Sequence, residues 1–192
     1  MLETNRLILR EFEENRQDYQ ALYSIMSDEE VNKYLPWYPF KSIKDAEEFY
    51  NKQLLPKYQN ESGYHFAICL KENNIPIGYV TVSSDSNHDF GYGLEKAFWS
   101  RGIVTEASEK IIEFLKSKEW KYITATHDVH NVASGKVMQK LGMEYKYSYK
   151  EQWQPKDILV TFRMYQLNLD GVHDRVYRAY WEKYPEHFIE EV

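Results

Sequence analysis

The chain has 192 residues, 43% of them hydrophobic, and a formal net charge of −6, which fits one folded domain with a buried core. Its 24 Lys and Arg residues form no basic stripe, so a nucleic-acid partner is not expected. Cys69 stands alone, which excludes an intrachain disulfide and predicts a buried thiol in a reducing compartment. The sequence starts without a signal-peptide core, and no apolar run reaches membrane-spanning length. We therefore expect a cytoplasmic protein without a membrane partner.

Hydrophobic periodicity predicts regular elements along nearly the whole chain. In chain order they are a strand at 6–12, helices at 18–26 and 43–58, strands at 64–71, 76–82 and 89–94, a helix at 101–118, a strand at 122–126, a helix at 131–141, and strands at 144–153 and 158–167. Two prolines keep the segment 34–40 out of any helix. This order predicts a mixed α/β (α+β) sheet with helices packed on it.

The tail at residues 170–192 is rich in Tyr, Trp and charged residues. Four aromatic residues fall near helical spacing, namely Tyr177, Tyr180, Trp181 and Tyr184. We predict an extra C-terminal helix that is interrupted at Pro185, and we divide the chain into a domain at 1–169 and this helical extension. The extension either packs on its own domain or forms a dimer contact, so the chain is a monomer or a homodimer.

The clearest chemical signal is the turn Trp99-Ser100-Arg101-Gly102-Ile103-Val104-Thr105, which joins a strand to a long helix. A helix N-terminus presents unpaired main-chain N–H groups and the positive end of the helix dipole. Gly102 lets an anion approach the backbone and Arg101 adds positive charge, so the turn predicts a diphosphate site. The preceding strand carries Gly91 and Gly93 on one face, which indicates a bend, a β-bulge or a closely approaching ligand.

A second motif follows the next predicted strand. Asn131 is a plausible N-cap of a short helix that carries Ser134 in its first turn and ends at Leu141-Gly142. With the start at residues 4–10, Asp89-Phe90-Gly91-Tyr92 and the turn at 99–107, the chain resembles the GCN5-related N-acetyltransferases (GNAT) over residues 3–167. Within that superfamily it is most similar to the RimJ/RimL-type ribosomal-protein N-terminal acetyltransferases. The resemblance implies a mostly antiparallel central sheet, splayed between its fourth and fifth strands, with helices on both faces.

The resemblance also implies acetyl-CoA as the acyl donor and no metal. The N–H groups of residues 101–105 would hold its pyrophosphate, and the pantetheine arm would pair along the strand at 89–94. Asn131 would bind the arm near its end. The implied cofactor-binding residues are Leu94, Trp99, Ser100, Arg101, Gly102, Ile103, Val104, Thr105, Asn131 and Ser134.

Two side chains are candidates for the proton transfers. Ser134 lies near the departing sulfur in related proteins, and Met138 stands where many relatives have an acidic Tyr, so Ser134 is the candidate proton donor. Asp89 stands where related enzymes often have Glu, and it is either the general base, acting directly or through water, or an exposed structural carboxylate. A main-chain N–H near Gly93 or Leu94 is the candidate oxyanion donor. The amine would attack the thioester directly in a ternary complex.

The acceptor itself is left open as a protein N-terminus or a small-molecule amine. In relatives the loop between the first two helices lines the acceptor groove, so Trp37 and Tyr38 either bind the acceptor or pack on the sheet edge. The chain departs from the family pattern at Val104, where the family usually has Gly or Ala, and at Met138. These departures leave a second hypothesis, an acyl-CoA-binding module or sensor without transferase activity. The segment 127–130 holds two His and one Asp, but their spacing does not provide a third clear metal ligand, so we expect no metal site.

Overall fold

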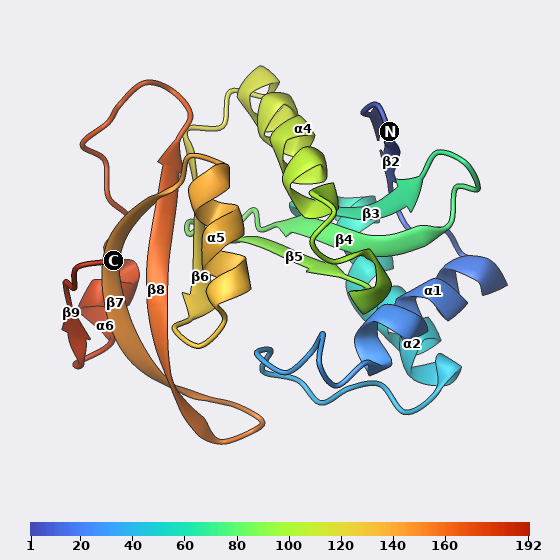
Figure 1. Ribbon diagram of the computed structural model, residues 1–192, viewed down its shortest axis with the longest axis horizontal. Coiled ribbons are helices and arrows are strands. Elements are labelled where there is room, and N and C mark those ends of the chain that lie inside the picture. Colours follow the sequence, from blue (N-terminus) through green and yellow to red (C-terminus); the bar gives the residue numbers. More distant parts are fainter.

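The computed structural model describes all residues from 1 to 192, and its strands form two antiparallel sheets (Figure 1). The first sheet has the order β1-β2-β3-β4-β5 and the second the order β6-β8-β7-β9. The strands of the first sheet are β1 Leu2–Glu3, β2 Leu7–Arg10, β3 Tyr64–Leu70, β4 Pro76–Val82 and β5 Phe90–Leu94. Those of the second are β6 Tyr122–Asp128, β7 Glu144–Trp153, β8 Ile158–Asn168 and β9 His187–Phe188.

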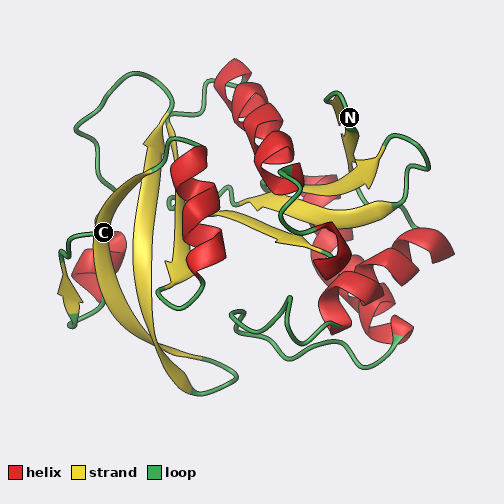
Figure 2. Cartoon of the chain, viewed as in Figure 1, coloured by secondary structure: helices red, strands yellow, loops and turns green.

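Helices cover both faces of the first sheet, with α4 on one face and α1 and α2 on the other (Figures 1 and 2). The helical elements are α1 Arg16–Ser27, α2 Ile43–Phe49, the π-helix η1 Tyr50–Leu54, α3 Leu55–Asn60, the 3-10 helix η2 Lys96–Phe98, α4 Ile103–Ser117, α5 Val132–Lys140 and α6 Ala179–Lys183. The predicted helix at 43–58 is therefore one helical segment with a π-turn in its middle. No helix is long and apolar enough to cross a membrane.

The two sheets meet at a single point. Asp89 and Thr124 form an isolated parallel bridge, in which the N–H of Thr124 donates to the carbonyl of His88 at 3.2 Å. Beyond it β5 is the last strand of the first sheet and β6 the first of the second, and Figure 1 shows them running apart. One edge of β5 is thus left without a strand partner.

Alternation along β3 divides the core into two clusters. Phe66 and Ile68 pack toward α4, whereas Ala67 and Cys69 pack toward α1 and α2, because successive side chains of a strand point to opposite faces. Cys69 is a buried free thiol, as expected, and burial raises its pKa to about 12. It therefore serves as a core side chain.

The two glycines of β5 make room for side chains of β4. The β4–β5 register is continuous, so the β-bulge considered for this strand is absent. A Cβ on Gly93 would lie 2.6 Å from the ring of Tyr79, and a Cβ on Gly91 would lie 3.1 Å from the methyl group of Thr81. Neighbouring side chains thus require the small residues on this face.

The tail differs from its prediction. In place of a long helix interrupted at Pro185, it forms the five-residue α6 and then β9, which pairs with β7. The ring of Tyr149 on β7 stacks on Tyr180 at 5.1 Å and on Tyr184 at 4.8 Å. These contacts hold the tail against the second sheet of its own chain, and pairing with β7 gives the backbone beyond Pro185 an alternative to helical hydrogen bonds. Of the four aromatic residues at helical spacing, Tyr180 and Trp181 lie on α6, so a helix forms there, but it is much shorter than the spacing suggested.

A buried ion pair joins β2 to the start of α1. The guanidinium of Arg10 contacts both carboxylate oxygens of Asp18, at 2.6 and 3.0 Å, and both residues are buried. We predict that Asp18→Ala lowers the free energy of unfolding by about 3–5 kcal/mol, because it leaves the Arg10 charge buried without its partner. Urea denaturation measures this loss. Glu48→Ala is the control, since it removes an exposed pair with Lys52 and should cost less than about 1 kcal/mol. An equally small loss for Asp18→Ala would contradict the prediction.

Candidate active site

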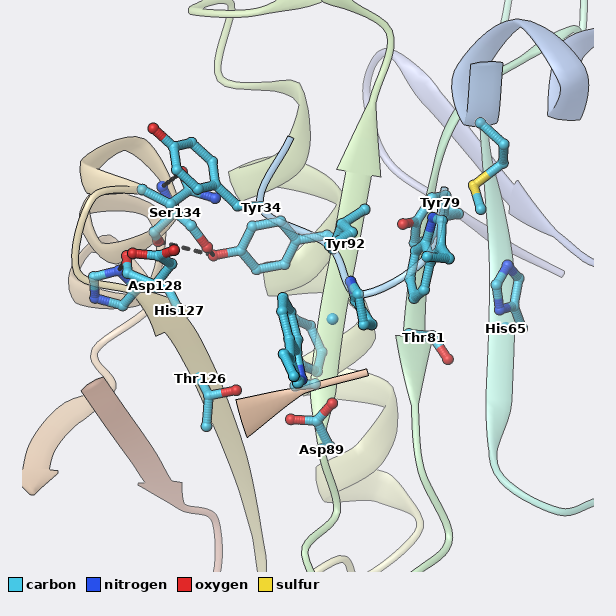
Figure 3. Close-up of a pocket in the computed structure, with 18 of the residues that line it drawn as sticks. Tyr34, His65, Tyr79, Thr81, Asp89, Tyr92, Thr126, His127, Asp128 and Ser134 are labelled. Carbon is cyan, nitrogen blue, oxygen red and sulfur yellow. Dashed lines mark hydrogen bonds between the residues drawn. The ribbon is translucent and has the colours of Figure 1, made fainter. Parts of the chain in front are cut away.

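A cavity of about 410 Å³ lies beside the point where β5 and β6 meet (Figure 3). Four neighbouring strands, β3 to β6, form its floor, while the loop between α1 and α2 and the hairpin of β7 and β8 complete its wall. Its polar lining residues are Gln53, Lys57, His65, Tyr79, Thr81, Asp89, Tyr92, Thr126, His127, Asp128, Asn131 and Ser134. The cavity therefore gathers side chains far apart in the sequence.

Asp89 stands in this cavity, at the bridge between the sheets (Figure 3). It is half-buried, and its carboxylate accepts no hydrogen bond and faces no cation within ion-pair distance. Burial raises the pKa of Asp89 to about 6, because desolvation disfavours the charged form. The group is mostly ionised at neutral pH and has a pKa in the range suited to proton transfer.

Ser134 lies in the first turn of α5, where Asn131 caps the helix as predicted and accepts the N–H of Ser134 at 3.3 Å. The hydroxyl of Tyr92 donates to the carbonyl of Ser134 at 2.9 Å and lies 3.0 Å from its Oγ (Figure 3). Burial raises the pKa of Tyr92 well above its usual value. Met138 is also buried at the cavity and brings no hydroxyl there.

Sequence reasoning missed Tyr92. The only signal for a role of Tyr92 was its position between Gly91 and Gly93. Because side chains alternate along β5, Tyr92 points to the face opposite to that of the two glycines. That face looks toward α5, which lies 42 residues further on in the sequence. The pairing with Ser134 depends on how β5 and β6 diverge, and the sequence indicated that divergence only through the family resemblance.

The turn before α4 forms an open cradle of main-chain donors. Ser100 and Gly102 adopt left-handed backbone conformations, with φ of 61° and 71°, and α4 begins directly after Gly102. The N–H groups of residues 101–105 donate to no acceptor in the chain. The indole N–H of Trp99 donates to the carbonyl of Leu94 at 2.8 Å and thereby fixes the turn to the end of β5. Unpaired donors at a helix start form an anion site.

Charge around this turn also favours an anion. Glu106 in the first turn of α4 is paired with Arg6 at 2.6 Å, and Arg6 also donates to the carbonyl of Arg101 at 3.0 Å. The side chain of Arg101 is exposed and rests over the ring of Phe98. Because Arg6 balances Glu106, the charge of Arg101 and the helix dipole remain available to an anion. Sequence reasoning omitted Arg6, which lies 100 residues from Glu106.

The free edge of β5 offers further main-chain groups. The N–H of Ser83 donates to the carbonyl of Asp89, and the N–H of Glu95 donates to the carbonyl of Ile77. These two bonds show that the odd-numbered residues of β5 direct their N–H and C=O groups toward β4. In an antiparallel ladder every second residue then turns its N–H and C=O outward. Residues 92 and 94 therefore present their N–H groups on the unpaired edge, between the turn and the cavity. Of the two oxyanion positions considered, this alternation favours Leu94 over Gly93.

The two predicted acceptor-binding residues occupy different places. Trp37 lines the cavity, and its indole N–H donates to the side chain of Asn32 at 3.1 Å. Lys156, at the tip of the β7–β8 hairpin, donates to the carbonyl of Asn32, so the hairpin meets the loop over the cavity. Tyr38 has 59% of its surface exposed and lies outside the cavity lining. The structure thus brings Trp37 together with the predicted catalytic groups but leaves Tyr38 apart.

The segment 127–130 forms local hydrogen bonds, although the buried Nε2 of His127 has no partner. His127 is buried and bonds the carbonyl of Asp128 at 2.8 Å, while His130 bonds the carboxylate of Asp128 at 2.9 Å. No group of three or more His, Cys, Asp or Glu side chains is arranged so that it could hold a metal ion.

Comparison with known proteins identifies the family. The family described as "Acetyltransferase (GNAT) domain" matches residues 6–144. The chain belongs to the GNAT family of acetyltransferases. A GNAT relative from Bacillus subtilis (strain 168), the "Uncharacterized N-acetyltransferase YnaD", is 30% identical over 152 residues, which are 77% of this chain and 85% of the relative. The resemblance seen in the sequence is thereby confirmed at the level of the GNAT superfamily.

Solved structures share the GNAT fold. An acetyltransferase (GNAT family) from Bacillus anthracis superposes with a TM-score of 0.76 at 24% identity, covering 88% of this chain and 98% of that one. RimL, a ribosomal L7/L12 alpha-N-protein acetyltransferase solved in complex with coenzyme A, superposes with a TM-score of 0.75 at 16% identity, covering 87% of this chain and 96% of that one. The family assignment makes this chain an N-acetyltransferase that uses acetyl-CoA.

The buried charge of Asp89 has a consequence for stability. Its pKa is raised from 3.8 to about 6 in the folded state, so the folded protein holds this proton more tightly than the unfolded chain. The resulting penalty is absent below about pH 4, grows as the pH rises and is complete above about pH 6. We predict that Asp89→Asn raises the thermal unfolding midpoint near about pH 8 and changes it little near about pH 4.

Differential scanning calorimetry at the two pH values measures this difference. Asp85→Asn changes an exposed carboxyl of the same segment and should leave the midpoint unchanged at both. If Asp89→Asn lowered the midpoint near about pH 8, the carboxylate would be a stabilising group and the prediction would be wrong.

Proposed function

We propose that this N-acetyltransferase transfers the acetyl group of acetyl-CoA to a primary amine bound in the cavity, by direct attack in a ternary complex. One arrangement carries the proposal: the two ends of β5. At one end lies the turn with unpaired N–H groups, and at the other lies Asp89, unpartnered in a cavity. The strand between them has a free edge and five residues, which span roughly 17 Å.

The donor half of the site follows from the main chain. The N–H groups of residues 101–105 would hold the pyrophosphate, with Arg101 adding charge and Trp99 fixing the turn to Leu94. The outward N–H groups of β5 would pair with the pantetheine arm. We propose that the splay between β5 and β6 gives this arm its route to the cavity, where Asn131 binds it. The half-buried Val104 keeps its N–H and so does not weaken this scheme.

The transfer removes two protons from the substrate ammonium and adds one to the departing sulfur. Asp89 would accept the first proton of the ammonium, directly or through water, so that the amine nitrogen attacks the thioester carbon. Leu94 would donate its N–H to the developing oxyanion. As the carbon–sulfur bond breaks, Ser134 Oγ would give its proton to the thiolate, and the second proton that the nitrogen loses as the amide forms would restore the Ser134 hydroxyl. Tyr92, hydrogen-bonded to Ser134, would hold that hydroxyl toward the sulfur, where Met138 offers no acid.

The finer assignments rest on the same sequence features as before. We propose the RimJ/RimL-type branch because of the motifs at residues 89–92, 99–107 and 131–134, although the likeness to RimL at 16% identity supports the fold alone. The division into residues 1–169 and a C-terminal extension, the cytoplasmic location and the monomeric or homodimeric state also stay predictions.

The proposed acetyl-CoA site can be tested by introducing one negative charge into the turn before α4. Gly102→Asp would place a carboxylate in the cradle, so we expect acetyl-CoA to bind at least about tenfold more weakly in isothermal titration calorimetry, a change of about 1.4 kcal/mol. Gly171→Asp is the matched control, because Gly171 has a similar φ of 81° and open space around its Cα but lies far along the chain from the turn. Equal affinities for the two variants would remove the turn from the donor site.

The chemistry can be tested by thiol release from acetyl-CoA with a panel of primary amines. We expect the wild type to release thiol with at least one amine. Ser134→Ala should lower kcat by about 100-fold and Tyr92→Phe by about tenfold, each with a nearly unchanged KM for acetyl-CoA, since both act in the proton transfer.

Tyr145→Phe is the control for Tyr92→Phe, because Tyr145 forms a similar hydroxyl pair with Ser148 at 2.9 Å, away from the cavity. Full activity of Ser134→Ala would exclude Ser134 as the proton donor. Tight acetyl-CoA binding without thiol release for any amine would favour a binding module over a transferase.

A further inference from the structure

The cavity extends across the sheet well beyond the catalytic groups. His65 on β3 pairs in register with Thr81 on β4, which pairs with Gly91 on β5, and Asp89 follows two residues away on the same face. Neighbouring strands lie about 4.8 Å apart, so the backbone at His65 lies roughly 10 Å or more from that at Asp89. Figure 3 shows His65 and Tyr79 on one side of Asp89 and Thr126 on the other. The cavity can thus hold an acceptor with two recognised ends.

The end at β3 is cationic and rich in hydrogen-bond donors. Lys57 on α3 lines the cavity, is half-buried and has no carboxylate within 4.0 Å. Burial, and then the nearby charge of Lys57, lower the pKa of His65 to about 3, so this ring is neutral. Its Nε2 is buried and has no hydrogen-bond partner. Buried polar groups in folded proteins are nearly always paired, so an unpaired one beside a cavity indicates a missing ligand group.

The helical segment above β3 is shaped to this end of the cavity. Phe49, Gln53 and Lys57 recur every four residues and all three line the cavity, although Gln53 itself is largely exposed. The π-turn η1 at Tyr50–Leu54 widens the helix between them, and such turns occur frequently at functional sites. It keeps these three side chains on the cavity side along two helical turns.

The charges of the two ends are therefore opposite. Asp89 and Asp128 lie on the side of β5 and β6, and Asp128 already accepts hydrogen bonds from His130, which leaves Asp89 for the acceptor. Lys57 lies on the side of β3. Between them the ring of Tyr79 stacks on His65, with ring centres 5.3 Å apart, and Thr81 lies next to it on β4, so an aromatic ring lines part of the middle of the cavity.

We propose that the acceptor is a small amine that carries an oxyanion, such as a carboxylate, at its other end, with the amine at Asp89 and the oxyanion at Lys57 and His65. This inference rests on the proposed function and narrows its acceptor. A polyamine would place a second ammonium beside Lys57, where like charges repel. An amino carboxylate with an extended apolar body satisfies Asp89, Lys57 and the unpaired Nε2 together.

The test compares acceptors of matched length in the thiol-release assay: straight-chain ω-amino carboxylates of six to ten carbons, the corresponding diamines and the corresponding monoamines. For the wild type we expect kcat/KM for the best amino carboxylate to exceed that of its diamine by at least about tenfold. Lys57→Glu should reverse this order, and Lys57→Met should bring the carboxylate and the monoamine to within about threefold of each other.

Lys52→Glu is the matched control, because Lys52 is exposed, outside the cavity and paired with Glu48. Quenching of tryptophan fluorescence by the amino carboxylate, with Trp37 in the cavity wall, gives a binding constant independent of turnover, and circular dichroism verifies that each variant folds. An unchanged acceptor order and binding constant in both folded Lys57 variants, or a wild-type preference for diamines, would overturn the inference while leaving the transferase intact. Absence of thiol release with every amine would instead count against the proposed function.

Discussion

The site depends on the way the two sheets meet, at one bridge between Asp89 and Thr124. If β5 and β6 paired along their length, the edge of β5 would be consumed by ladder hydrogen bonds and its N–H groups would be unavailable. A single bridge joins the two sheets but leaves that edge free. The same bridge places Asp89 against the second sheet, where desolvation raises its pKa to about 6. The free edge of β5 and the raised pKa of Asp89, the proposed base, are thus two consequences of one backbone contact.

The bridge also determines which side chains meet across the gap. Tyr92 leaves β5 toward α5 and reaches Ser134, whereas Asp89 and Gly91 lie on the opposite face of the strand, and all four residues line the cavity. Because alternation along a strand separates neighbours onto two faces, β5 and the residue before it can bring the proposed proton-transfer groups to the cavity from both. The glycines next to Tyr92 then serve packing: Gly93 gives space to Tyr79, whose ring forms part of the cavity wall.

Local sequence signals predicted the elements well where the chemistry is local. The helix expected at 101–118 is α4 at Ile103–Ser117, and the N-cap at Asn131 is present, since a cap and a periodic apolar face are encoded within a few residues. Contacts between distant segments were not predictable. Arg6 pairs with Glu106 over 100 residues, and nothing near either one indicates the other. The tail was predicted only in part for the same reason: α6 forms before Pro185, but the pairing of β9 with the distant β7 was not visible in the sequence.

The anchors at the two ends of β5 are fixed by different forces, and this difference bears on specificity. At Leu94 the indole N–H of Trp99 ties the turn before α4 to the strand by one neutral hydrogen bond. The donors of that turn are main-chain N–H groups, which are present whatever side chains the residues carry. The cavity around Asp89 is lined by side chains from several strands, helices and loops, many of which can change without disturbing the ladder. β5 therefore holds the proposed donor site, built from main-chain groups, at a fixed distance from the proposed acceptor site, built from side chains. That difference explains why local motifs in the sequence pointed to the donor, whereas the proposed recognition of the acceptor depends on long-range placement of residues such as Lys57 and His65.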